Sequence, residues 1–169
     1  DRPHEVLEAV STLFAAITAG EIRRRILLSL SEPPTLRRLL WQLVHSDERR
    51  TSGDAQLADF FAYLDPKGAS VVAEVAASLE GVQWADAMHD FLLRSMRGHE
   101  EPVGDLLPMA TVPGGELLLS VLSDIGTEAA ALAAVKGLDS EHVPIRSAAM
   151  RWLPYVPEPA AASYVARLI

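Results

Sequence analysis

The residues best suited to chemistry by type and spacing are Asp86, His89 and Asp90. Asp86 and His89 are three positions apart, so on a helix they would share one face, as metal ligands and acid–base pairs do. The segment also fits a second interpretation, because Asp86, Asp90 and Arg94 step by four residues, which is the spacing of ion pairs on a solvated helix surface. Trp84 and the apolar residues around His89 would then form the buried stripe of that helix. We favour the surface interpretation.

No other familiar chemical site can be recognised in the sequence. His99 falls in an expected turn with Glu100 and Glu101, and no second His stands nearby at a spacing that suits a metal. The chain has no Cys, which excludes thiolate chemistry, disulfides and zinc ribbons. Phosphate-binding glycine loops and the G-x-S-x-G nucleophile motif are missing as well. We therefore expect no enzymatic activity, no metal and no cofactor.

The charges are distributed unevenly along the 169 residues. Residues 1–50 carry a net charge of +1, with eight Arg against seven acidic residues, whereas residues 51–169 carry a net charge of −9. A row of Arg on successive helices could follow a phosphate backbone, but the acidic remainder would repel nucleic acid and no aromatic residues alternate with these Arg. A protein with an acidic segment is the partner we expect, with plain solvation of the helix faces as the alternative. The predicted partner-binding residues are Arg23, Arg24, Arg37, Arg38 and Trp41.

Composition and the placement of Pro and Gly predict an all-α chain. Ala and Leu, which are strong helix formers, number 25 and 24, and alternating β-branched runs are nearly absent. A hydrophobic content of 49% excludes disorder, and no apolar run approaches the ~18 residues of a membrane span. Pro and Gly recur where helices start and end. The predicted helices are 4–18, 21–31, 35–46, 54–64, 67–80, 83–97, 102–110, 115–125, 127–138, 142–153 and 158–168.

These short helices contain internal similarity. Pro66 starts a segment whose apolar spacing recurs 47 residues later from Pro113, and a further apolar helix follows each copy. In a second pattern, over 139–153, an acidic turn leads to a helix with an apolar residue, an Arg, two Ala and a closing Leu. This segment resembles the second helix of HEAT-type repeats, and residues 20–31 are similar to it. Equivalent apolar positions, separated by 35, 46 and 42 residues, are close to one two-helix unit apart: Ile22, Leu57, Val103 and Ile145.

The resemblance implies a right-handed α-α superhelix, a HEAT-like solenoid of ten to eleven short antiparallel helices, in one domain over residues 1–169. In such repeats the Arg at the position of Arg146 pairs with an acidic side chain or a helix end, and Asp139 or Glu141 is the expected partner. Trp152 would belong to the core or cover the last repeat. Repeat proteins of this kind present an extended surface to another protein, so we expect a non-catalytic interaction or scaffold module.

Two alternatives stay open. Some HEAT-like proteins resemble DNA glycosylases, and then Trp41 beside Arg37 and Arg38, or Trp84 with Asp86, would act on a bound substrate. A helical sensor of a small ligand is the other, although the sequence shows no converging polar set for it. The start without Met suggests a piece of a longer protein, and 13 Arg against two Lys suit a bacterium with a GC-rich genome. We further expect a cytoplasmic protein without membrane contact, and self-association through exposed repeat ends.

Overall fold

Helices and short turns make up all the regular secondary structure that the computed structural model describes, which covers residues 12, 32–44, 60–81 and 84–168. No strand occurs in these ranges, so the predicted all-α class is confirmed there. None of the described helices combines the length and the apolar character that crossing a membrane would require. The expectation of a single domain stays a prediction.

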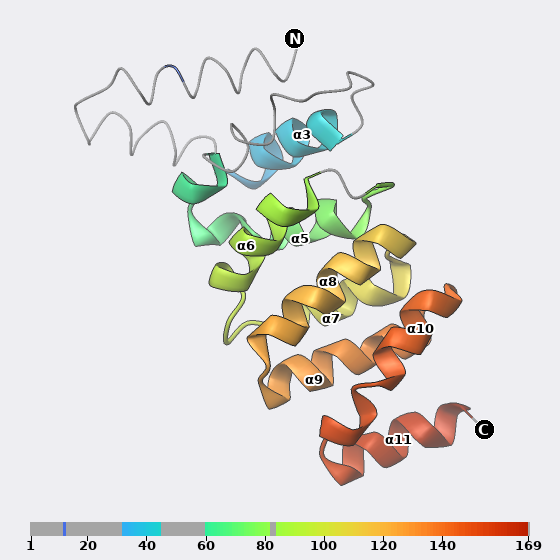
Figure 1. Cartoon of the computed structure of the whole chain (residues 1–169). Coiled ribbons are helices and arrows are strands. Elements are labelled where there is room, and N and C mark those ends of the chain that lie inside the picture. Colours follow the sequence, from blue (N-terminus) through green and yellow to red (C-terminus); the bar gives the residue numbers. More distant parts are fainter. Residues whose placement is uncertain (1–11, 13–31, 45–59, 82–83, 169) are drawn as a thin grey trace.

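The described helices begin and end close to their predicted bounds. In the numbering of Figure 1, the α-helices are α3 (Pro33–Val44), α5 (Ala69–Ala77), α6 (Ala85–Ser95), α7 (Glu101–Leu106), α8 (Val112–Ile125), α9 (Glu128–Ala134), α10 (Val143–Met150) and α11 (Glu158–Leu168). Short 3-10 helices extend or join them: η1 (Pro66–Gly68), η2 (Leu107–Met109), η3 (Val135–Asp139) and η4 (Leu153–Tyr155). The helices predicted at 4–18, 21–31 and 54–64 fall wholly or largely outside the described residues.

Local sequence sets both ends of α8. Thr111 precedes the helix in an extended conformation, and its Oγ1 accepts a 3.2 Å hydrogen bond from the N–H of Gly114, which makes it an N-cap. Pro113 occupies the first turn, where its missing N–H leaves no helical bond unmade. Gly126 ends the helix with a φ of 67°, which Gly adopts without the steric penalty of a Cβ. Thr127 then caps α9 through its side chain.

From α5 onward the helices lie in two rows (Figure 1). In one row α6, α8 and α10 contact one another in succession, and in the other α5, α7 and α9 do so. Contacts of α8 with α5 and α9 join the rows, and α3 packs on α5. Buried apolar side chains form a main core that extends from Leu36 to Ile145 and a smaller core around Val135 and Val156 near the C-terminal end.

Glycines let the helices approach closely at two crossings. A Cβ on Gly114 would overlap the main chain of Ala77 at the end of α5, and a Cβ on Gly104 would overlap the backbone of Ala133 in α9. Thr111 fastens the first crossing, because its N–H donates a 2.9 Å hydrogen bond to the carbonyl oxygen of Ala77. Packing between helices, and not local conformation, therefore requires Gly at these two positions.

The internal similarity of the sequence does not correspond to a two-helix unit. Val103 lies in α7 and Ile145 in α10, while Pro66 and Pro113 stand at the starts of the segments that form α5 and α8. Two further helices separate each pair, so the two members of a pair fall in opposite rows. The expectation that equivalent positions lie one two-helix unit apart was wrong because the helices are short. With six residues in α7 and seven in α9, three helices fit where two were expected.

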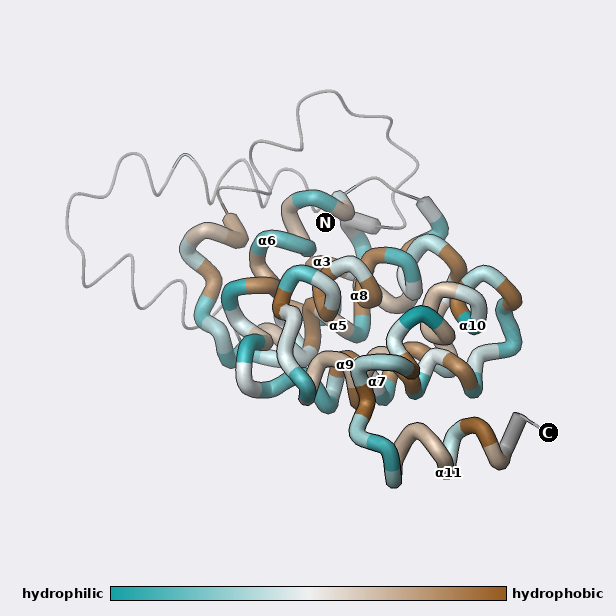
Figure 2. Tube along the Cα trace, turned by 60° about the horizontal axis from the view of Figure 1, so that its bottom comes forward, coloured by the Kyte–Doolittle hydropathy of each residue, from teal (hydrophilic) through white to brown (hydrophobic). Residues whose placement is uncertain are grey.

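The last helix, α11, lies at the C-terminal end of the array in both views (Figures 1 and 2). Its Ala160, Ala161 and Tyr164 pack against the smaller core, whereas Val165 is exposed. Hydrophobic and hydrophilic segments alternate along the helices in Figure 2, as expected for helices that bury one face.

Candidate functional site

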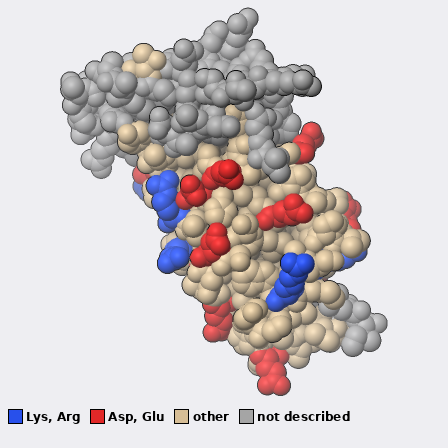
Figure 3. Space-filling view, in the orientation of Figure 1, with Lys and Arg blue, Asp and Glu red and all other residues tan. Residues whose placement is uncertain are grey.

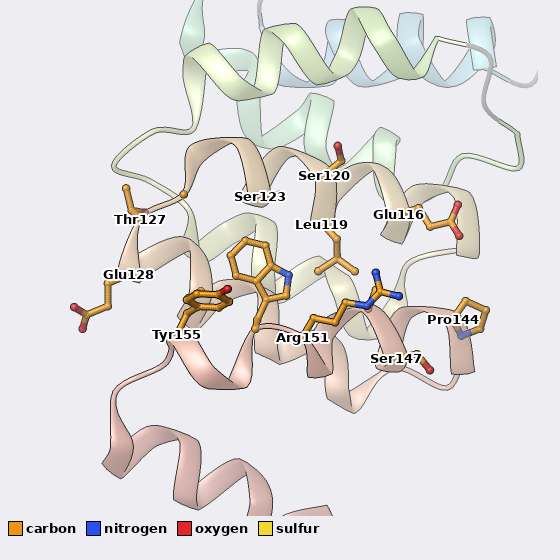
Figure 4. A pocket seen from close by; sticks show the side chains of 14 residues that line it. Glu116, Leu119, Ser120, Ser123, Thr127, Glu128, Pro144, Ser147, Arg151 and Tyr155 are labelled. Carbon is orange, nitrogen blue, oxygen red and sulfur yellow. The ribbon is translucent and has the colours of Figure 1, made fainter.

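A groove of about 1050 Å³ opens between α8 and α10, and the start of α9 and η4 also line it (Figure 4). Fourteen residues line this groove, and ten of them are exposed, so it is open to solvent. Small-molecule sites usually enclose most of the ligand surface. The open shape therefore suits a segment of another chain better than a small molecule. The less exposed lining residues are Leu119, Ala131, Ala148 and Trp152.

Two aromatic side chains stand at one end of the groove. Trp152 packs against both hydrophobic cores, so the fold fixes its indole. The ring of Tyr155 lies 6.3 Å from that of Trp152, centre to centre and edge-on at 67°, and Tyr155 is 71% exposed. Large aromatic residues contribute much of the binding energy at protein interfaces. This pair therefore offers a partner a fixed wall and an accessible ring.

Three charged side chains line the groove: Arg151 directly after α10, Glu116 in α8 and Glu128 in α9. In the described part of the chain, none of the three side chains forms an ion pair or hydrogen bond. Lys136 in η3 differs, since it forms a 2.5 Å ion pair with Asp105. Figure 4 shows the Arg151 guanidinium directed towards α8 on the side of the groove where Glu116 lies, while Glu128 stands at the other end, beyond Tyr155, with its carboxylate directed away from Arg151. The groove thus presents a negative, a positive and a negative charge in order.

Hydroxyl groups provide the remaining polar character of the groove. Ser123 on α8 and Ser147 on α10, one turn before Arg151, have no hydrogen-bond partner for their hydroxyls among the described residues. The other two hydroxyls of the lining are already engaged, Ser120 with His89 and Thr127 with Glu100. A hydroxyl can both donate and accept hydrogen bonds. An extended peptide carries main-chain N–H and C=O groups that need such partners, whereas a helix pairs its own. The lining therefore suits an extended segment.

The residues that the sequence marked as chemical candidates lie on α6, which packs against α8 and contributes no residue to the groove. Asp86 and Asp90 are exposed, as the surface interpretation predicted. Arg94 donates to the main-chain oxygen of Asp90 at 3.1 Å and, among the described residues, forms no ion pair with the Asp86 or Asp90 carboxylates, so the predicted ladder of ion pairs does not form. His89 instead turns to α8, where its Nε2 lies 3.1 Å from Oδ2 of Asp124. Sequence reasoning missed this partner because the two residues are far apart in the chain.

The environment of His89 determines whether it could act as a base. Ser120 Oγ lies 3.4 Å from the same Nε2 that meets Asp124. In a Ser–His–acid triad the serine and the acid bind different ring nitrogens, so that the ring can accept the serine proton. Here an Nε2–H that donates to Asp124 cannot accept a proton from Ser120. The contact therefore joins α6 to α8 and does not activate a nucleophile.

Glu100, which the sequence placed in a turn with His99, is 3% exposed. Burial acts to raise the pKa of its carboxyl group. Hydrogen bonds from the N–H groups of Gly98 and Glu100 itself and from the Thr127 hydroxyl, with the charge of His99, outweigh burial and hold the pKa below its ordinary value of 4.5. Glu100 is therefore an ionised structural acid. Within the described residues, no group of three or more His, Cys, Asp or Glu could hold a metal ion.

The described members of the predicted partner-binding set, Arg37, Arg38 and Trp41, do not line the groove. Arg23 and Arg24 lie outside the described residues. Arg37 pairs with Glu74 of α5 through a 3.0 Å bond from its Nε, so it holds α3 in place. Arg38 and Trp41 are exposed on α3, and Trp41 is 49% exposed.

The predictions for the segment around α10 can be compared with the structure directly. Nη1 of Arg146 donates to the main-chain oxygens of Ser140 and Glu141, at 2.8 and 2.7 Å. Arg146 is structural, as predicted, and Glu141 provides its carbonyl oxygen. Trp152 packs in the core, as predicted, and also borders the groove. Arg151 received no role from the sequence, although its four-residue spacing from Ser147 was a signal that the two share a helix face.

Comparisons of the chain with known protein families, with curated proteins and with solved structures gave no match.

Proposed function

We propose that this chain is a non-catalytic protein-interaction module of the HEAT-like helical-repeat class, and that it binds a segment of a partner protein in the groove between α8 and α10. The two successive rows of helices support the repeat class, because stacked helix rows present long grooves between neighbouring helices. The short connections and the close crossings at Gly104 and Gly114 support it further.

The groove itself carries the proposal. It combines the exposed ring of Tyr155, a fixed Trp152 and three charged side chains that no described residue neutralises. Buried aromatic anchors with a polar rim are typical of sites that bind another protein. Among the chemical candidates, His89 is bound to Asp124 in a geometry that does not activate Ser120. This combination favours recognition of a partner over catalysis.

The alternative function, action on nucleic acid, has less support. Trp84 is buried, so its indole cannot stack on a base. Figure 3 shows acidic side chains spread over the face that α6 and α8 present, and Glu116 and Glu128 would repel phosphates from the groove. Arg38 and Trp41 on α3 are the residues that this alternative needs. Retention of duplex DNA at low salt that is lost in Arg38→Ala would support it.

Self-association belongs to the same proposal. Val143 and Met150 are exposed on α10, the last helix of its row among the described residues. Apolar side chains at the end of a helix row are suited to contact a second copy of the chain. Light scattering at increasing protein concentration tests this, with Met150→Lys as the variant expected to reduce any association.

Selection of peptides by the groove tests the main proposal. We expect a random peptide library, selected on the full chain, to yield binders that lose about tenfold or more in affinity for Ser123→Trp. The new indole would fill the groove from an exposed position on α8. Ser70→Trp is the matched control, because Ser70 is exposed on α5 and does not line the groove. Selected peptides that bind Ser123→Trp as tightly as the wild type, or a selection that yields no binder, would contradict the proposal.

A further inference from the structure

We propose that the groove selects an extended peptide segment in which one carboxylate side chain stands between two basic side chains. This inference rests on the proposed function and names the chemistry of the partner. It follows from the order of charges, since Arg151 lies between Glu116 and Glu128 along the groove (Figure 4).

Arg151 determines the central element of the ligand. Its guanidinium projects into the groove and has no ion pair or hydrogen bond to any side chain or carbonyl in the described part of the protein. A guanidinium group has five N–H donors in a planar array that fits a carboxylate through two parallel bonds. Ser147, one turn earlier on α10, also lines the groove.

The two glutamates favour a carboxylate over a phosphate at this position. With Glu116 and Glu128, the three charged residues of the groove have a net charge of −1. A phosphate group carries about −1.5 to −2 at neutral pH, so it would add more repulsion than a single carboxylate. An acidic side chain is therefore the anion that this groove prefers, and a phosphopeptide is an alternative that the experiment distinguishes.

The ends of the groove determine the flanking elements. Glu128 and the exposed ring of Tyr155 line the same end, so a Lys or Arg could place its aliphatic stem and cation over the ring and its charge near the carboxylate. Glu116 offers a carboxylate to a second cation at the other end. Ser123, between these ends on α8, is available to the main chain of the ligand.

Binding of peptides with different charge orders to the full chain tests the proposal by fluorescence anisotropy. The probes are extended, Gly- and Ser-spaced peptides of equal composition, with Glu between two Lys or with Glu moved to one end, in a short series of spacings. We expect the best central-Glu peptide to bind about tenfold or more tightly than its rearranged form. Replacing its Glu with phosphoserine should weaken binding.

The Arg151→Glu variant gives the decisive comparison. We expect it to lose the preference for central Glu and to prefer the peptide in which Lys replaces that Glu. Arg97→Glu is the control, because Arg97 is exposed after α6 and does not line the groove. An unchanged ranking in Arg151→Glu, tighter binding of the phosphoserine peptide, or no binding of any central-Glu peptide to the wild type would overturn the inference.

The failures of the inference and of the proposed function can be distinguished. If Ser123→Trp abolishes binding of the selected peptides but Arg151→Glu leaves their ranking unchanged, the groove binds a partner by other chemistry and only the inference is wrong. If Ser123→Trp has no effect on any bound peptide, the groove is not the binding site, and both are wrong.

Discussion

The carboxylate of Glu100 accepts a 3.0 Å hydrogen bond from the hydroxyl of Thr127, which ties the turn before α7 to the start of α9. Glu100 also accepts a 3.0 Å bond from the N–H of Gly98, and Thr127 caps α9 through its own oxygen. Because Thr127 and the next residue, Glu128, line the groove, this partly buried contact fixes one end of the proposed binding site.

The Glu100→Gln variant should be less stable than the wild type by about 1 kcal/mol at neutral pH, because it replaces a charged acceptor of buried hydrogen bonds. The folded protein holds the pKa of Glu100 below 4.5. The ionised carboxylate therefore contributes its full stabilisation at pH values above the ordinary pKa of the group. This contribution is lost as the pH falls through the lower pKa of the folded protein. Urea unfolding of both proteins across this range measures the effect.

The control for Glu100 is Glu101→Gln, since Glu101 is its neighbour in sequence and is exposed. We expect its stability to follow that of the wild type within about 0.5 kcal/mol at each pH. A stability difference between wild type and Glu100→Gln that stays constant from neutral to acid pH would contradict the assigned role of the charge.

Two adjacent glycines in α8 should differ in their tolerance of Ala. A Cβ on Gly114 would overlap the main chain of Ala77, which cannot move without shifting α5, whereas a Cβ on Gly115 would meet the end of the Ile145 side chain. We expect Gly114→Ala to cost about 2 kcal/mol or more and Gly115→Ala clearly less, because Ile145 can change rotamer. Chemical denaturation compares the two, and equal or reversed losses would show that the helix crossing is looser than described.

The contact of His89 with Asp124 should make a small but measurable contribution to the stability of the fold. In a double-mutant cycle with His89→Ala and Asp124→Ala we expect a coupling energy of about 0.5–1 kcal/mol, since both groups are partly exposed to solvent. Asp90, whose Oδ1 lies 3.7 Å from Nδ1 of His89 and whose side chain is 81% exposed, provides the control cycle. Its coupling should be near zero. A stronger coupling to Asp90 than to Asp124 would contradict the role of His89 as a link between α6 and α8.

Substitutions of Trp152 and Tyr155 should have different effects, the first mainly on the stability of the fold and the second mainly on peptide binding. Trp152→Ala removes a side chain that packs against both cores, so we expect a loss of about 2 kcal/mol or more in the free energy of unfolding. Tyr155→Ala should change stability by about 0.5 kcal/mol at most, because the ring is largely exposed, but should weaken binding of the selected peptides. Unfolding and anisotropy measurements on the same samples check both; a Tyr155→Ala protein that binds like wild type would exclude its ring from the site.

The sequence predicted the helices well because their ends depend on neighbouring residues. Pro113 and Gly126 bound α8 by local conformational preferences, which act in any tertiary context. The structural role of Arg146 was expected from the resemblance to HEAT-type repeats, and its partners lie only five and six residues away in the chain. Local patterns of this kind can be recognised without the fold.

The groove could not be predicted because it depends on packing. Ser123 lies on α8 and Arg151 directly after α10, and α9 separates these two helices in the chain. The two residues come close only because α8 packs against α10, and neither belongs to a sequence motif. Asp124 likewise meets His89 only through the contact of α8 with α6. The Arg37 and Trp41 segment attracted notice through its composition, yet Arg37 is used to hold α3 on α5.

Amide chemical-shift mapping of the full chain with a peptide selected on it tests the central claim most directly. We predict that the largest changes will fall along the groove, on the amides of α8 and α10 and the turn that follows, including Ser123, Ser147 and Arg151. Changes confined to α3, around Arg38 and Trp41, would contradict the account and move the binding site to the surface that the sequence first suggested.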